Sequence, residues 1–124
     1  MDTSIQIIAE IGTSHGGDIG KAKELIHAAA EAGATAVKFQ WVFANEILHP
    51  NTGFVALPGG SVRLYDRFKS LEVSPDFFSD CLEYAHKKGI LFACTPFGLK
   101  SLSLLAQIQP DAIKIASPEV NHTP

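Results

Sequence analysis

Two lysines lie inside short apolar segments of this 124-residue chain, where lysine is seldom found. Lys38 lies in the segment AVKFQW (36–41) and Lys114 in the segment AIKIAS (112–117). Both segments are flanked by helix-like sequence and have the pattern of buried parallel strands. Because an unpaired ammonium group is costly to bury, two such cations predict a shared anion between the strands. A lysine solvated at a strand end explains either residue alone, but nearby Gln40, Ser117 and Glu119 favour the anion site.

Strand-like and helix-like segments alternate along the chain. Alternating or continuous apolar runs predict strands over 5–9, 35–40, 90–94 and 112–116. Helical spacing of apolar residues predicts helices between Asp18 and Gly33, over 62–70, between Ser74 and Gly89, and around 99–108. The alternation predicts a parallel sheet with right-handed crossovers.

Two parallel architectures compete, a doubly wound sheet and a (β/α)₈ barrel. The segment GTSHGG (12–17) follows the first strand but matches neither GxGxxG nor GxxxxGK[ST], which disfavours the doubly wound sheet. Polar residues instead fall at the C-terminal ends of all four predicted strands, as expected at the mouth of a barrel. These residues are Glu10, Lys38, Gln40, Thr95, Lys114, Ser117 and Glu119. We therefore expect a parallel (β/α) barrel, or TIM barrel, of which only about the first four βα units are present, since a complete barrel needs about 250 residues.

Residues 45–60 show no sustained period and contain two prolines and three glycines. The segment reads as a long loop that holds at most a short turn of helix, and loops of this length are usually functional. Its apolar side chains predict packing over the barrel mouth or against a partner subunit: Ile47, Leu48, Phe54, Val55 and Leu57.

Composition excludes several classes of partner. The net charge is −3 and no basic stripe occurs, so we expect no nucleic-acid partner. No signal peptide or membrane-spanning run is recognisable, so we expect a cytoplasmic protein without a membrane partner. Cys81 and Cys94 match no CxxC pattern and are expected to be reduced core residues.

Four motifs in order resemble the N-terminal half of the sialic acid (N-acetylneuraminate) synthase family. They are IAEIG (8–12) with His15 and Gly17, VKFQ (37–40), TPF (95–97), and KIAS (114–117) with Glu119. Their order and spacing match over nearly the whole chain. The resemblance implies that residues 1–124 are the N-terminal part of a TIM-barrel synthase domain, with the rest of the barrel and a small antifreeze-like domain expected beyond them.

The resemblance also implies an activity in carbohydrate biosynthesis. Members of that family are metal-dependent transferases that condense phosphoenolpyruvate with an N-acylated amino sugar, such as N-acetylmannosamine, to give a nonulosonic acid and phosphate. A divalent Mn²⁺ or Mg²⁺ is held by two histidines of later strands, so its ligands are expected outside this chain. A homodimer is expected for the full-length protein.

Residue roles follow from the same resemblance. Lys38 and Gln40 are similar to the pair near the phosphoenolpyruvate carboxylate. Thr95, Lys114 and Ser117 resemble the residues that hold its phosphate and adjacent carboxylate. These roles suit the residue types, because lysine neutralises anionic groups and hydroxyl groups donate to phosphate oxygens without adding charge.

The resemblance also implies two catalytic carboxylates, and two residues of this chain depart from the family's pattern. Glu10 matches an acidic residue at the floor of the reacting centre, and Glu119 matches one that faces the sugar. His15 is the histidine expected nearest the mouth. Trp41 stands where the family usually has threonine, and Pro118 where it usually has glycine, which affects the sugar side most.

Two other functions remain open at this point. One is a related phosphoenolpyruvate-dependent sugar-acid synthase on the same barrel, and the other is a non-catalytic fragment that binds anions or sugar phosphates. The chain by itself is expected to bind phosphate or phosphoenolpyruvate weakly and to lack synthase turnover, because turnover needs the metal and a closed barrel.

Overall fold

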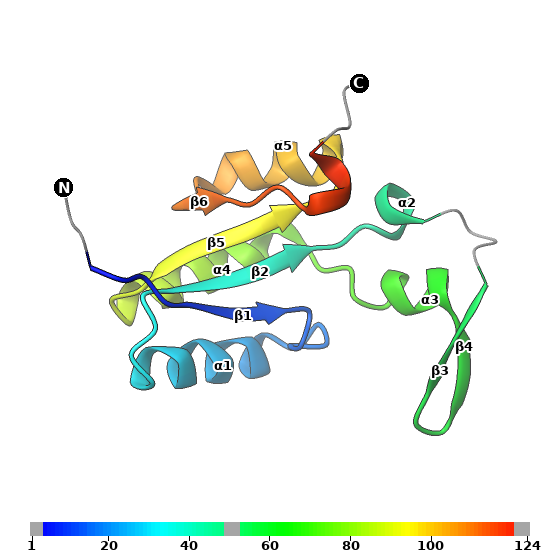
Figure 1. Cartoon of the computed structure of the whole chain (residues 1–124), viewed down its shortest axis with the longest axis horizontal. Helices are drawn as coiled ribbons and strands as arrows, with labels where there is room; N and C mark the ends of the chain where they lie inside the picture. The colour runs from blue at the N-terminus through cyan, green and yellow to red at the C-terminus, as the bar shows by residue number, and fades with distance from the viewer. Residues whose placement is uncertain (1–3, 49–52, 121–124) are drawn as a thin grey trace.

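The computed structural model describes residues 4–48 and 53–120. Within them, a parallel sheet contains β1 (Ile8–Gly12), β2 (Ala36–Trp41), β5 (Leu91–Pro96) and β6 (Ala112–Ile113) in the spatial order β1-β2-β5-β6 (Figure 1). Sequence order is therefore kept across the sheet, as in the first half of a (β/α) barrel. The expected first strand begins and ends three residues too early, and β6 is shorter than expected.

One face of the sheet is covered by α1 (Ile19–Glu31), α4 (Pro75–Lys87) and α5 (Leu99–Ile108). Val37, Phe39 and Trp41 point to this face and are fully buried, whereas Lys38 and Gln40 alternate with them. The predicted division of β2 into an apolar and a polar face is confirmed. Cys81 and Cys94 are buried free thiols, as expected.

Local sequence explains where the two longest helices begin and end. Asp18 accepts a hydrogen bond from the Lys21 amide at 3.2 Å and so caps α1. Pro75 begins α4, where its missing N–H is not needed. Gly33 and Gly89 follow the two helices with φ of +88° and +80°, a conformation that glycine adopts without strain.

The segment between β2 and α4 forms a separate small unit. It contains α2 (Ala44–Ile47), a hairpin of β3 (Phe54–Leu57) and β4 (Gly60–Arg63), and α3 (Leu64–Lys69). Figure 1 shows the hairpin extending away from the parallel sheet.

The prediction of an irregular loop over 45–60 was wrong for the hairpin. Four-residue strands give too short a pattern to detect, and the Pro58-Gly59 turn pairs them. The predicted short turn of helix is present as α2. The Phe54 side chain is 75% exposed, so it does not pack over the mouth in this chain, and residues 49–52 lie outside the described residues.

Among the described residues, no helix is long and apolar enough to cross a membrane.

His15 belongs to the aromatic core. Its ring centroid lies 4.7 Å from that of Phe77 and 5.9 Å from that of Phe39, and the residue is 1% exposed. Nδ1 accepts a hydrogen bond from the Gly17 amide at 2.9 Å, which places the proton of the neutral ring on Nε2. Nε2 is buried without a hydrogen-bond partner in the described part of the chain. Burial, followed by the nearby charge of Lys21, lowers the pKa of His15 below its ordinary 6.5.

This lowered pKa predicts a loss of stability on acidification. The unfolded chain takes up a proton at His15 before the folded chain does, so the free energy of unfolding falls as the pH drops through about 6.5. A His15→Gln variant should lose this component of the pH dependence. Urea unfolding at pH 7.5 and 5.5, followed by the fluorescence of Trp41, the single tryptophan, measures it. A His27→Gln variant, which changes an exposed histidine of α1, is the control, and an unchanged pH dependence in His15→Gln would refute the assignment.

Candidate active site at the strand ends

A cation lies between a carboxylate and a hydroxyl group on the face of the sheet opposite the helices. Lys38 Nζ lies 3.0 Å from Glu10 Oε2 and donates a hydrogen bond to Thr95 Oγ1 at 3.0 Å. The Lys38 side chain is 13% exposed and that of Glu10 is 52% exposed. Thr95 is almost fully buried. Three of the residues predicted from sequence therefore meet in one cluster.

Strand register explains why these three side chains meet. Glu10 on β1 is paired with Lys38 on β2, and Lys38 is paired with Ala93 on β5. Paired residues of neighbouring strands point to the same face. Because the Ala93 side chain is small, Lys38 can reach past it toward the carboxyl end of the sheet, where Thr95 lies. Gln40, paired with Thr95, shares this face.

Gly12 is part of the same arrangement, although sequence reasoning assigned it no role. Its φ is +58°, and the pairing of β1 with β2 shifts register between Glu10 and Gly12. A Cβ atom at this position would lie 3.2 Å from Glu10 Oε1 and 3.6 Å from Gln40 Oε1. A glycine at the end of a strand-like segment was the available signal, since it marks close approach or a bulge. Gly12 allows the Glu10 and Gln40 side chains to approach each other.

The residues predicted at and after the fourth strand, Lys114 and Ser117, are exposed and do not join the cluster. The Lys114 amide donates to the Cys94 carbonyl at 3.0 Å, but the residue is exposed, so its predicted burial is wrong. The reason is that β6 is two residues long and lies at the edge of the sheet. Ser117 is also exposed, at the start of the 3₁₀ turn η1 (Ser117–Glu119). No hydrogen bond among the described residues joins Lys114 or Ser117 to the cluster of Glu10, Lys38 and Thr95.

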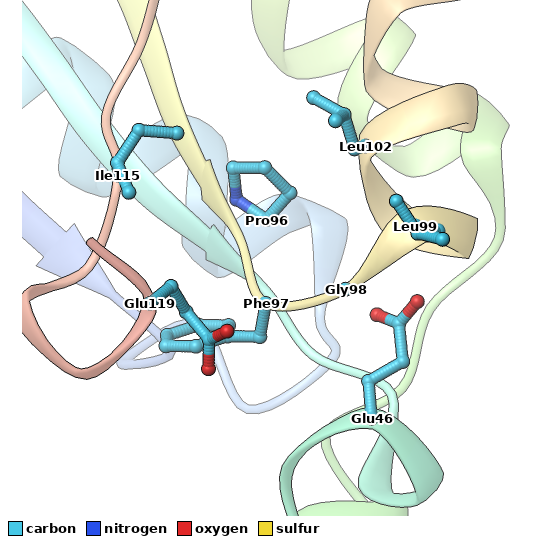
Figure 2. A pocket seen from close by; sticks show the side chains of 8 residues that line it. All are labelled: Glu46, Pro96, Phe97, Gly98, Leu99, Leu102, Ile115 and Glu119. Atoms are coloured by element: carbon cyan, nitrogen blue, oxygen red, sulfur yellow. The ribbon is translucent and has the colours of Figure 1, made fainter. Parts of the chain in front are cut away.

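A groove of about 490 Å³ opens beside the ends of β5 and β6. Figure 2 shows the Glu119 side chain beside Phe97 on one side and Glu46 below Gly98 on the other. The remaining lining is mostly apolar: Pro96, Leu99, Leu102 and Ile115. Glu119 therefore faces a cavity at the strand ends, whereas the His15 ring packs among the phenylalanines on the helix side of the sheet.

The cluster has the chemistry of an anion site. The Lys38 ammonium is largely withdrawn from water and already has a hydroxyl partner, while the Glu10 carboxylate that balances it is accessible. A bound carboxylate or phosphate could replace Glu10 on Lys38 without leaving a buried charge unpaired. Within residues 4–48 and 53–120, no group of three or more His, Cys, Asp or Glu side chains could hold a metal ion.

The chain is similar to several known proteins, among them sugar-acid synthases. The chain is 38% identical to the spore coat polysaccharide biosynthesis protein SpsE of Bacillus subtilis over 99% of its own length and 33% of that protein. It is 36% identical to the N,N'-diacetyllegionaminic acid synthase of Legionella pneumophila, covering 95% of this chain and 34% of that one. The chain thus spans about a third of the length of these relatives.

A solved structure shares the fold. The N-acetylneuraminic acid (sialic acid) synthetase of Leptospira borgpetersenii, solved in complex with citrate, aligns with a TM-score of 0.78 and 33% identity, covering 94% of this chain and 38% of that one. The parallel sheet and its helices therefore match part of the barrel of sialic acid synthases, as expected from the sequence. The NeuB family model matches residues 25–124, and the chain belongs to the NeuB family.

Proposed function

We propose that this chain is part of an enzyme that condenses phosphoenolpyruvate with an N-acylated amino sugar to form a nonulosonic acid and phosphate. The observation that carries the proposal is the largely buried Lys38 ammonium between Glu10 and Thr95 at the strand ends. Relatives named as synthases of N,N'-diacetyllegionaminic and pseudaminic acids support the class of product.

Phosphoenolpyruvate has two anionic groups, and the chain offers two lysines for them. In the proposed complex, the substrate carboxylate replaces Glu10 on Lys38, and the Gln40 amide lies beside it. The Thr95 hydroxyl keeps Lys38 oriented throughout, because its contact does not depend on the substrate. Lys114 and Ser117, both exposed at the edge of the sheet, supply a second cation and a second hydroxyl group for the phosphate.

The proposed reaction forms a carbon–carbon bond and a bond from carbon 2 to the oxygen of water, and it breaks the bond from carbon 2 to the phosphate oxygen. Carbon 3 of phosphoenolpyruvate attacks the aldehyde carbon of the open-chain sugar, water adds to carbon 2, and inorganic phosphate leaves with cleavage of the C2–O bond. Glu10, released from Lys38, stabilises the developing cation at carbon 2 or places the water. Glu119 faces the sugar from the groove. The ligands of the expected Mn²⁺ or Mg²⁺ are two histidines proposed to lie in later strands, and the described residues contain no group of His, Cys, Asp or Glu that could hold the ion.

The apolar edges of the sheet support association with further protein. Ile5 and Ile7 before β1 and Ile8 in it are 88%, 60% and 55% exposed, and Ile113 in β6 and Ile115 after it are 40% and 51% exposed. Surfaces of this kind are usually covered in a stable protein. We propose that the rest of a barrel covers them and that the full-length protein is a homodimer.

Removal of either lysine in a full-length protein that contains these residues tests the proposal. Lys38→Met and Lys114→Ala should each lower kcat/KM for phosphoenolpyruvate by roughly 100-fold or more, as expected for a loss of a few kcal/mol at an anion site. The KM for the amino sugar should change little, because neither lysine faces the groove of Glu119. Steady-state phosphate release with each substrate varied in turn measures both constants.

The matched control is Lys87→Ala, an exposed lysine in the last turn of α4, which should retain wild-type kinetics. Wild-type kcat/KM in Lys38→Met would contradict the assignment of the cluster. Wild-type kcat/KM in Lys114→Ala alone would limit the anion site to Lys38 and Thr95.

A further inference from the structure

A second contact joins the strand-end connections outside the cluster of Lys38. Glu46 Oε1, in α2 after β2, accepts a hydrogen bond from the Ser101 amide at 3.0 Å. Ser101 is the third residue of α5, so Glu46 satisfies one of the amides that a helix leaves free at its N-terminus. The two residues are 55 positions apart in the chain. Figure 2 shows the Glu46 carboxylate directed toward Gly98 at the start of α5.

The start of α5 lacks a side-chain cap of its own. Gly98 is the N-cap residue, a position where Ser, Thr, Asp or Asn normally provides the acceptor. Ser101 Oγ accepts from the amides of Phe97 and Gly98 at 3.1 and 3.2 Å. Because Gly98 has no side chain that could accept from the Ser101 amide, that amide donates to Glu46 instead. The helix is therefore capped by a carboxylate from a different connection.

The position of the Glu46 carboxylate, and not the backbone, favours glycine at residue 98. Its φ is −166°, an extended conformation that any residue can adopt. A Cβ atom at this position would lie 2.5 Å from Glu46 Cδ and 2.6 Å from Oε1, distances at which something must move. The glycine and the glutamate therefore form a matched pair.

Other contacts hold α2 in the same place. Lys100 Nζ, in the first turn of α5, lies 4.1 Å from the centroid of the Phe43 ring, directly before α2. The Ala44 amide donates to Glu72 Oε1 at 2.9 Å, which ties the start of α2 to the connection between α3 and α4. Thus α2 is fixed on one side by Glu72 and on the other by α5.

We propose that Glu46 is a positioning residue that caps α5 from outside and thereby fixes α2 beside the groove of Glu119. The carboxylates of Glu46 and Glu119 both line that groove, whereas Lys38 and Thr95 are held in place by the pairing of β2 with β5. Loss of the cap should therefore disturb the part of the site that binds the amino sugar and leave the part that binds phosphoenolpyruvate intact. This catalytic consequence rests on the proposed function, but the cap itself does not.

A double-mutant cycle in the 124-residue chain tests the cap. Glu46→Ala should lower Tm by about 3–6 °C, the shift expected for a lost N-cap in a domain of this size. Gly98→Ser alone should also lower Tm, because its Cβ meets Glu46. The double variant should recover most of the loss, since the serine then has room and caps the helix itself. Glu24→Ala, which removes an exposed carboxylate on α1, is the control. Additive losses in the double variant would overturn the cap.

Kinetics of a full-length protein that contains these residues test the positioning role. Glu46→Ala should raise the KM for the amino sugar by roughly 10-fold and leave the KM for phosphoenolpyruvate unchanged. Glu46→Gln should restore both Tm and this KM, because its amide oxygen can accept from the Ser101 amide. An unchanged sugar KM in Glu46→Ala would overturn the positioning role even if the cycle holds. If the effects of Glu46→Ala and Gly98→Ser on Tm are not additive, the cap is confirmed. If the full-length protein then has no synthase activity, the proposed function is refuted while the cap stands.

Discussion

The ion pair of Lys38 with Glu10 depends on the alternation of side chains along β2. Val37, Phe39 and Trp41 of this strand face the helices and complete the core, so the residues that alternate with them, Lys38 and Gln40, must face the opposite side of the sheet. A lysine in that position is excluded from the core and is balanced by Glu10 and Thr95. A shift of one residue in register would place the ammonium against Phe92 and Phe78. Folding and the geometry of the candidate site are therefore set by the same strand.

The connections at the carboxyl ends of the strands depend on this sheet in turn. Parallel pairing brings the segments after β2 and β5 to one edge, where α2 and the start of α5 meet. The carboxylate of Glu72 accepts a hydrogen bond from the first amide of α2. In the same way, the carboxylate of Glu46 accepts a hydrogen bond from an amide near the N-terminus of α5. Such contacts between connections allow loops to hold a defined shape over the candidate site.

Sequence reasoning recovered the fold and most of the cluster because both depend on regular patterns. The period of two in β2 gave the correct face for Lys38 and Gln40, and the order of strands and helices gave the parallel sheet. The burial of Lys114 was not predictable, because it depends on whether a neighbouring strand covers β6. The contact of Glu46 with Ser101 left no signal, because it joins residues 55 positions apart through one amide. The sequence shows that residues 12 and 98 are glycines, but it does not show which side chains lie close to them in the fold.

In the proposed complex, Lys38 exchanges Glu10 for an anionic group of the substrate. The most direct measurement is an NMR titration of the purified chain with phosphoenolpyruvate, which follows the side-chain Cε signals of lysine and assigns Lys38 through Lys38→Met. The account predicts that the Lys38 signal shifts with saturable binding, that the signal of Lys87 does not move, and that Lys38→Met loses the binding. A Lys38 signal that stays in place at saturating phosphoenolpyruvate, or unchanged affinity in Lys38→Met, would contradict it.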